Sequence, residues 1–426
     1  MREDLLHHIW KFRNFSSQVH YSSTGERVEV IHPGEHNHDS GPDFFNARIR
    51  IDKLEWAGNV EIHVKSSDWV VHGHSSDRAY DNVILHVVYD DDKPEKLRNS
   101  TFPTLEIKGH IDPSVIERYD ALIEHQTFVP CAAILDSSIA GSMLTNNYIE
   151  RLFIEKLEYK SKLILELLKA SNGNWERTFY QVVARSFGLG VNRLPFELLL
   201  GSIPSSLALS DMDNIEQVEA LLFGQAGFLN ISSPDEYSSN LQAHYDQLNT
   251  TYQLHAISAH LWKFSRLRPG NFPTLRIAQL AAFLYQKRLR FKHFMQVKDL
   301  SCLIKWFRVE ASGYWAGHSK FGRSTLQRST RLGSMAIASI LINAVLPTMF
   351  VYGRAMNQPE LAERSIELIQ QIRGETNKIV DEWQKLGFAI DSALESQALL
   401  HLKKEYCDRK KCLSCAIGTA ILEQSS

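Results

Sequence analysis

The side chains best suited to chemistry stand at two places near the front of the chain. Asp43 follows a Gly-Pro pair, and eighteen residues later Glu61, His63 and Lys65 occupy alternate positions. Side chains two apart on a strand share a face, so the last three would project together. Two carboxylates can hold Mg²⁺ through oxygen ligands while a neighbouring base or cation activates a water. Such a constellation suits hydrolysis of a phosphodiester bond.

The two carboxylates must be brought together by a strand pair. If the strand after Asp43 turns back at Asp52-Lys53, its start lies opposite Glu61. Asp43 and Glu61 would then bind Mg²⁺, with Lys65 or His63 as the catalytic base or charge stabiliser. The alternative is that the alternating polar residues form the solvated face of an antiparallel sheet. The strand order and the polar residues around Asp43 favour a site.

Histidines offer a second enzyme class. The first 127 residues hold 12 of the 18 histidines, and imidazole suits zinc, iron or manganese. A histidine-rich metallohydrolase therefore competes with the magnesium site. The histidines considered are His36, His38, His72, His74 and His86. His72 and His74 fall in an expected turn, whereas His86 lies between apolar neighbours and is expected to be a hydrogen-bonded core residue.

Strand signals are confined to the front of the chain. The pattern predicts a helix over 2–12, strands over 27–32, 44–52, 54–69 and 83–90, helical turns over 75–82, and a last strand over 104–107. Three strands in hairpin succession, a short helix and a further strand indicate an α+β fold, with a small mixed α/β sandwich at the N-terminus. We place this domain at 1–125 and a large all-α domain at 126–426.

Helical spacing dominates after residue 113. Helices are predicted over 148–168, 177–187, 214–223, 254–264, 275–288, 335–346 and 359–386. The uncharged segment 333–353 is nearly long enough to cross a bilayer, but it contains Asn343 and Pro347. We interpret it as a helix buried in the helical domain rather than a membrane span.

Charge is unevenly distributed along the chain. Residues 1–127 carry 22 acidic and 14 basic side chains, whereas 261–335 carries 15 Lys and Arg against Asp299 and Glu310. Cations interleaved with aromatic rings suit binding of nucleic acid. The alternative is that the rings fill the core and the cations solvate helix surfaces. The predicted nucleic-acid contacts are Arg268, Arg276, Lys287, Arg288, Arg290, Lys292 and Arg323.

Cysteines gather at the end of the chain. Cys407, Cys412 and Cys415 form a C-x4-C-x2-C group, whose thiolates can ligate zinc or an iron-sulfur cluster. A fourth ligand would be Cys131 or Cys302, with Cys131 favoured, and unliganded thiols are the alternative. Five cysteines without a paired framework, and two acids with two histidines in the first residues, favour a reducing, cytoplasmic compartment.

Pro42-Asp43, a hairpin and Glu61-x-His63, within a helix-strand-strand-strand-helix-strand order, resemble the PD-(D/E)xK superfamily. The resemblance covers about the first 110 residues. It implies a restriction-endonuclease-like fold and metal binding by Asp43 and Glu61. His63 stands where that superfamily has lysine, so either Lys65 takes over the role or the site is degenerate.

The whole chain is also similar to a bacterial family of uncharacterised proteins, a domain of unknown function. The stretches that carry this similarity include GPDFFNARIRI, GNVEIHVKSSDW, RPGNFPTLRIAQLA and YCDRKKCLSCAIG. Our first hypothesis is a magnesium-dependent nuclease acting on DNA. The second is a nucleic-acid-binding or scaffolding protein whose nuclease-like domain has lost its chemistry.

Overall fold

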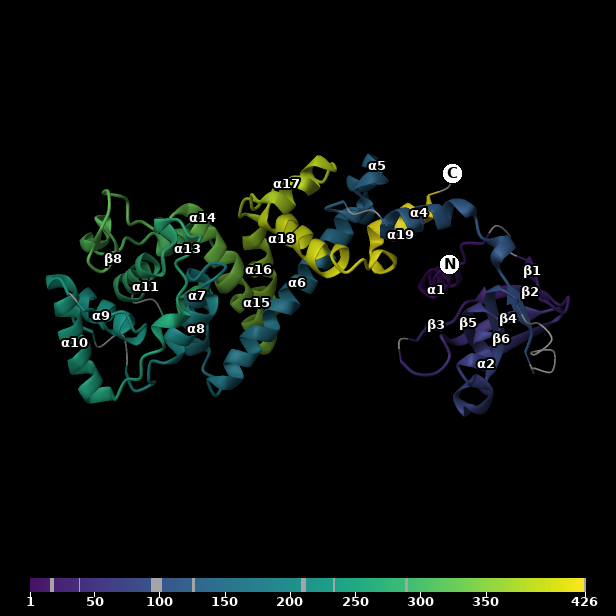
Figure 1. The fold of residues 1–426 in the computed structure, drawn as a ribbon, viewed down its shortest axis with the longest axis horizontal. Coiled ribbons are helices and arrows are strands. Elements are labelled where there is room, and N and C mark those ends of the chain that lie inside the picture. The colour runs from purple at the N-terminus through teal and green to yellow at the C-terminus, as the bar shows by residue number, and fades with distance from the viewer. Residues whose placement is uncertain are drawn as a thin grey trace. The chain divides into compact units, whose positions relative to one another are not determined.

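The structure is a computed structural model that describes residues 1–15, 19–37, 39–92, 102–124, 127–207, 212–232, 234–287 and 290–424. A sheet-rich N-terminal region precedes a helical region (Figure 1). This confirms the predicted mixed class at that level. Within the helical region, a small hairpin of β8 (His318–Lys320) and β9 (Arg323–Ser324) departs from the predicted all-α composition.

One seven-stranded sheet organises the front of the chain. Its hydrogen-bonded order is β1-β2-β4-β5-β6-β7, with β3 paired to β4. The pairs among β1, β2, β4 and β5 are antiparallel, whereas β5–β6 and β6–β7 are parallel. The strands are β1 (Val19–Tyr21), β2 (Arg27–His32), β3 (Glu35–His36), β4 (Phe44–Ile51), β5 (Leu54–Lys65), β6 (Val83–Asp90) and β7 (Thr104–Glu106).

A short helical connection joins the parallel strands β5 and β6. It comprises α2 (Asp68–Val71) and two 3-10 turns, His74–Ser76 and Arg78–Tyr80. The strand predicted to run to residue 69 therefore ends at Lys65. The physical reason is local, because the Asp68 carboxylate accepts a hydrogen bond from the Lys65 N–H and starts the helix.

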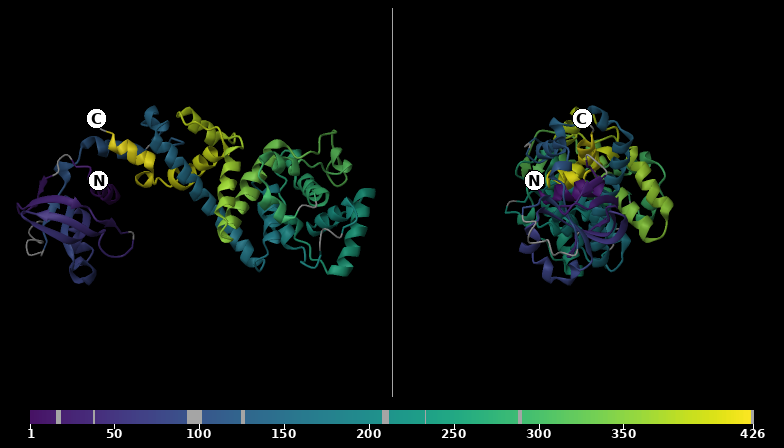
Figure 2. Two further views of the ribbon diagram at one scale, coloured as in Figure 1. Left: turned by 180° about the vertical axis from the view of Figure 1, so that it is seen from behind. Right: turned by 90° about the vertical axis from the view of Figure 1, so that its right-hand side faces the viewer.

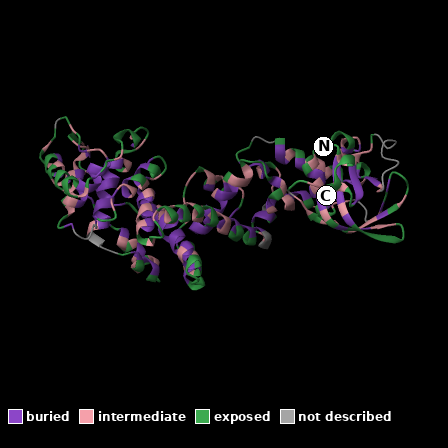
Figure 3. Cartoon of the chain, turned by 90° about the horizontal axis from the view of Figure 1, so that it is seen from below, coloured by how far each residue is buried: buried purple, intermediate pink, exposed green. Residues whose placement is uncertain are grey.

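Both faces of central β5 are covered. Val60 and Ile62 are fully buried, and Glu61 and His63 on the other face are only 4% and 1% exposed. Helices α1 (Glu3–Phe12) and α2 both pack on β5. Glu61 and His63 therefore do not form a solvated polar face. Figure 3 shows buried residues along the strands of this sheet.

Contacts divide the chain into two compact units. The first comprises Met1–Ile149, Lys378–Ala389 and Leu399–Ser426, and the second comprises Glu150–Asn377 and Ile390–Ala398. The sequence boundary at 125 differs from this division because the end of the chain packs against its beginning.

Helix α4 (Pro113–Glu124) contacts elements from both ends of the chain. The Tyr119 hydroxyl donates to Asp4 in α1, and the Arg118 guanidinium donates to the carbonyl of Leu422 in α19 (Ala416–Glu423). Local periodicity carries no signal for such contacts, so the sequence could not place the C-terminal helix in this unit.

The remaining helices are α5 (Ser137–Ala140), α6 (Met143–Ala170), α7 (Trp175–Phe187), α8 (Arg193–Gly201), α9 (Ile215–Gln225), α10 (Glu236–Tyr252), α11 (Pro273–Lys287), α12 (Phe291–Gln296), α13 (Leu300–Phe307), α14 (Ser334–Ile340), α15 (Leu346–Ala355), α16 (Pro359–Gln370), α17 (Lys378–Lys385) and α18 (Ala393–Leu402). Of these, α6, α7, α9, α11, α14 and α16 lie over segments with predicted helical spacing, whereas α5, α8, α10, α12, α13 and α18 were not predicted; Figure 2 shows the ribbon in two further views.

Two predicted helices are wrong in part. The segment 254–264 is irregular apart from one 3-10 turn, because its backbone and side chains bond to the end of α9 instead of to one another: the Ile257 N–H donates to the Gln225 carbonyl, and the Trp262 indole donates to the Ala226 carbonyl. The segment 359–386 is broken into α16 and α17.

The apolar segment forms a continuous helical run over 334–355, in which a π-helical turn, Leu341–Val345, joins α14 to α15. In the part of the chain that the structure describes, it is the one helix that is long and apolar enough to span a membrane, and 67% of its most apolar window is buried inside the protein. This burial agrees with its interpretation as a core helix.

Candidate metal centre

The β4–β5 pair brings the two predicted carboxylates together. Its register pairs Phe44 with Val60, which places Asp43 next to Glu61. The Asp43 N–H donates to Glu61 Oε2 at 3.1 Å, and the Ile62 N–H donates to Asp43 Oδ2 at 2.9 Å. The hairpin expected from the Asp52-Lys53 turn thus positions both acids.

Three histidines meet beside Glu61. His63 comes from β5, His72 lies directly after α2, and His74 begins the next 3-10 turn. One ring nitrogen of each lies within 4.8 Å of those of the other two. His63 is buried, His74 is intermediate and His72 is exposed, so the group extends from the core to the surface.

The carboxylate of Glu61 contacts two members of this group. Glu61 Oε1 lies 3.1 Å from His74 Nε2 and 3.4 Å from His63 Nε2. His63 Nε2 in turn lies 3.1 Å from His72 Nδ1 and 3.3 Å from His74 Nε2. A neutral imidazole has a single N–H, so protons cannot satisfy all of these contacts, and several lone pairs face one another.

These separations match the edges of a small coordination polyhedron. A tetrahedral ion with bonds of about 2.0–2.1 Å to nitrogen and oxygen separates its ligands by roughly 3.4 Å. One cation between them would satisfy lone pairs of Glu61, His63 and His74 together, and His72 lies next to His63. Glu61, His63 and His74 therefore have the donor set and spacing of a metal site, with His72 as a further ligand candidate.

His86 contacts this group on its buried side. It lies in β6 with no exposed surface, and its Nε2 is 2.9 Å from Nδ1 of His63. It is the hydrogen-bonded core histidine that the sequence predicted. A partner on the far nitrogen fixes the ring orientation and tautomer of a ligating histidine.

Without a bound cation, burial favours neutral imidazole rings and a protonated carboxyl group on Glu61. Burial, followed by the neighbouring histidines, lowers the pKa of His63 to about 2, and burial lowers that of His86 to about 3. Burial and then the charge of Asp43 raise the pKa of Glu61 to about 9. A divalent cation would replace the proton that Glu61 otherwise holds at neutral pH.

His7 of α1 joins the site from a distant part of the sequence. Its Nε2 lies 3.3 Å from Asp43 Oδ2. Burial lowers the pKa of His7, but the hydrogen bond and charge of Asp43 outweigh burial, and the net shift is upward. His7 was not among the predicted site residues, since only the packing of α1 on the sheet brings it to Asp43.

Lys65 is exposed at the end of β5, unlike Glu61 and His63 on the same strand. Its predicted role as base or charge stabiliser depended on a shared face along the strand. The chain turns into α2 directly after Lys65, and the histidines that follow that helix approach Glu61 instead.

The side chains predicted to contact nucleic acid differ in how far they are exposed to solvent. Arg268, Arg290, Lys292 and Arg323 are exposed, whereas Lys287's side chain and all of Arg288 lie outside the described residues.

Arg276 is 7% exposed, and its guanidinium donates to Gln279 and Asn271, so it stabilises the interior rather than offering a surface cation. Some of the rings in this region also belong to the core, since Phe294 and Trp315 are fully buried. Part of the basic, aromatic pattern therefore reflects packing.

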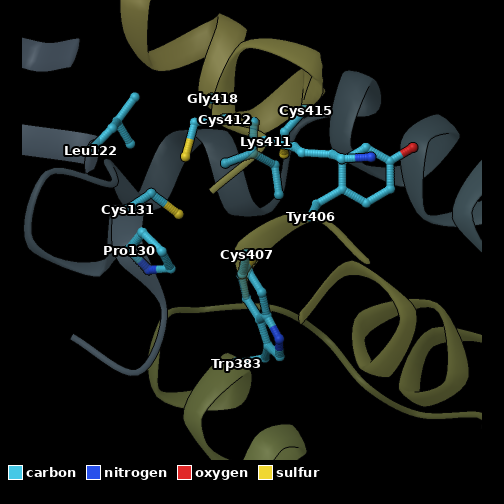
Figure 4. Close-up of a pocket in the computed structure, with 11 residues that line it drawn as sticks. Leu122, Pro130, Cys131, Trp383, Tyr406, Cys407, Lys411, Cys412, Cys415 and Gly418 are labelled. Carbon is cyan, nitrogen blue, oxygen red and sulfur yellow. The ribbon is translucent and has the colours of Figure 1, made fainter. Parts of the chain in front are cut away.

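The cysteines of the C-terminal motif meet Cys131. Cys131, Cys407, Cys412 and Cys415 line one cavity (Figure 4). Cys302, the other candidate for a fourth ligand, lies in α13 of the second unit.

Comparison with protein families matches residues 3–378 to a family described as a protein of unknown function, DUF2851. Searches of curated proteins and of solved structures found no match.

Proposed function

Since the chain belongs to the DUF2851 family, whose description names no activity, we propose from its site that it is a metal-dependent hydrolase of phosphodiester bonds in nucleic acid. The observation that carries this proposal is the clustering of ligand atoms around His63 Nε2, which lies 3.1–3.4 Å from Glu61 Oε1, His72 Nδ1 and His74 Nε2. Lone pairs gathered at this spacing call for a cation.

The donor set favours a transition metal over magnesium. Mg²⁺ prefers oxygen ligands in an octahedron, whereas imidazole nitrogen suits zinc, manganese or iron. We therefore propose zinc, manganese or iron in place of the magnesium that Asp43 and Glu61 suggested by themselves. A metal that accepts five or six ligands keeps room for a water and a substrate oxygen beside the four side chains.

The remaining polar groups have roles that follow from their positions. A bound metal supplies a water of lowered pKa and polarises a phosphoryl oxygen. Asp43, which is next to Glu61 and lies 3.3 Å from His7 Nε2, is placed to accept the proton of an attacking water. Exposed His72 marks the side from which substrate approaches.

The choice of nucleic acid as substrate has separate support. Asp43 before one strand and Glu61 within the next, followed by a helix and a parallel strand, is the arrangement by which the N-terminal region resembles PD-(D/E)xK nucleases. We propose a restriction-endonuclease-like domain in which His63 takes the lysine position. The exposed Arg268, Arg290 and Arg323 fit a polyanion such as DNA.

A non-catalytic nucleic-acid-binding protein is the second candidate. The observation in its favour is the missing lysine, since His63 is fully engaged with other histidines and Lys65 is exposed. The two candidates differ in whether metal produces cleavage.

Metal titration followed by a cleavage assay tests the proposal. Chelator-treated full-length protein is titrated with Zn²⁺, Mn²⁺ and Mg²⁺ by calorimetry, beside a His72→Ala/His74→Ala variant. The wild-type protein should show one more binding event with Zn²⁺ or Mn²⁺ than the variant, and should cleave labelled single- or double-stranded DNA or RNA. Identical isotherms would disprove the metal centre, and binding without cleavage would support the second candidate.

His86 provides a test of the supporting hydrogen bond. His86→Leu removes the partner of His63 Nδ1 while keeping an apolar side chain in the core. We expect metal affinity to fall about 10- to 100-fold, as is usual when the orienting partner of a ligating histidine is lost. Competition with a metal-sensitive dye measures the change. Unaltered affinity in a variant with wild-type circular dichroism would show that His86 only fills space.

A further inference from the structure

We propose that Cys131, Cys407, Cys412 and Cys415 hold an iron-sulfur cluster. The four come from two parts of the chain that meet in the first unit. Cys131 lies in the 3-10 helix Pro130–Ala133, and Cys407 ends the π-helical turn Lys403–Cys407. Cys412 begins the 3-10 helix Cys412–Ser414, and Cys415 caps α19. This centre is separate from the histidine site and does not depend on the proposed hydrolase activity.

The four thiols are enclosed yet unpaired with one another. Cys131, Cys412 and Cys415 are 7–8% exposed, and all four cysteines are free rather than disulfide-bonded. They line a cavity of about 20 Å³ together with apolar side chains such as Leu122 and Trp383 (Figure 4). Four thiols from distant segments around one cavity are the ligand set of a thiophilic metal centre.

The spacing favours a cluster over a single zinc ion. Zinc bound to four thiolates at about 2.3 Å separates the sulfur atoms by roughly 3.8 Å. Among the residues that the structure describes, which include all four cysteines, no three of these sulfur atoms form a group within 4.8 Å of one another. The sulfur atoms are therefore spread more widely than zinc requires. An iron-sulfur cluster binds its thiolates on several irons and needs this wider spacing.

Backbone groups are directed at the sulfur of Cys415. The N–H groups of Ile417 and Gly418, at the start of α19, oppose the rise that burial causes in the pKa of the Cys415 thiol. A β-carbon on Gly418 would lie 2.2 Å from the Cys412 carbonyl oxygen, so only glycine lets the helix start approach that loop. Donors to cysteine sulfur stabilise an anionic cluster and tune its potential.

Cations are also close to the cavity. Lys411 lines it, and the Lys410 ammonium group donates to the carbonyl of Ile123 at the end of α4. Lys403 lies over the ring of Phe128, with its nitrogen 4.5 Å from the ring centre. A cluster held by four thiolates is anionic, and nearby ammonium groups offset that charge.

The position of the cluster indicates what it does. It joins the segment after the sheet to the C-terminal helix α19, which packs on α4. His8 of α1 hydrogen-bonds to the backbone of Leu413, inside the cysteine loop. The cluster therefore holds α1 in place. His7, the residue before His8 in α1, contacts Asp43 beside the histidine site.

The test is the metal and sulfide content of full-length protein purified without oxygen. We expect about four iron and about four acid-labile sulfide per chain, with the broad visible absorption of an iron-sulfur cluster. Cys131→Ser should lose at least half of the iron and sulfide, whereas Cys302→Ser, a matched change in the second unit, should keep both. The His72→Ala/His74→Ala variant should also keep its sulfide, which separates this result from the histidine site.

Three outcomes would overturn the proposal. Zinc at one equivalent, retained in the His72→Ala/His74→Ala variant and without sulfide, would replace the cluster by a zinc site. Wild-type protein that holds neither iron nor zinc at the cysteines would show that they are packing thiols. A folded Cys131→Ser variant that keeps the iron content of the wild-type protein would show that Cys131 is not a ligand.

Discussion

His63→Ala should abolish metal binding at the histidine site and reduce phosphodiester hydrolysis on the order of 1000-fold, equivalent to about 4 kcal/mol of transition-state stabilisation. The reason is its central position. Its Nε2 is within 3.4 Å of ligand atoms from Glu61, His72 and His74, and its other nitrogen bonds to His86. Steady-state cleavage rates and metal content of the purified variant measure the effect.

Lys65→Met is the matched control for this experiment. Lys65 lies two residues further along the same strand but is exposed. The variant should retain wild-type metal content and cleave at close to the wild-type rate. If Lys65→Met were inactive and His63→Ala active, the lysine of a PD-(D/E)xK site would reside at position 65, and the histidine proposal would be wrong.

His63 is buried, so its removal could also disturb folding. His72→Ala avoids this difficulty because His72 is exposed and lies outside the sheet. We expect His72→Ala to fold normally and to bind metal more weakly, with a corresponding loss of cleavage at limiting metal that added metal restores. A structural effect alone would not be rescued in this way.

Glu219→Gln should stabilise the protein by about 2–3 kcal/mol at pH 8 and by little at pH 4.5. Glu219 is fully buried in α9, where its Oε2 accepts a hydrogen bond from Tyr237 at 2.8 Å and its Oε1 has no hydrogen-bond partner. Burial raises its pKa to about 7, although hydrogen bonds from Tyr237 and Ser312 oppose the shift.

The sign of the effect follows from the two protonation states. Below the ordinary pKa of 4.5 the carboxyl is protonated in both folded and unfolded chains, so it costs nothing. Between 4.5 and about 7 the unfolded chain releases its proton first, and stability falls as pH rises. Above about 7 the folded state carries a buried charge, and the full cost remains. Glutamine cannot ionise and avoids that cost.

Urea unfolding at pH 4.5 and pH 8 measures the difference between Glu219→Gln and wild type. Glu216→Gln is the control, because Glu216 is exposed on the same helix and should change stability by less than about 0.5 kcal/mol. An equal effect of Glu219→Gln at both pH values would mean that the carboxyl does not titrate in the folded protein as its burial requires.

Much of the sheet was predictable because alternation of apolar and polar residues is a local signal. The strand at 83–90 and the first helix lie where the pattern predicted them. The helix predicted over 254–264 was wrong because the structure of this segment depends on contacts that are not local. Its spacing is helical, but hydrogen bonds to the end of α9, which no local pattern reports, determine its backbone.

By itself, the sequence determined the pieces of each site that are close along the chain: the Asp43–Glu61 pair across one hairpin, and the C-x4-C-x2-C loop. The tertiary structure decided which distant side chains complete them. It brought His7 to Asp43, gathered His72 and His74 around His63, selected Cys131 over Cys302, and buried Arg276. Neighbouring residues share a strand or turn whose geometry is fixed locally, whereas contacts between remote segments depend on how whole elements pack.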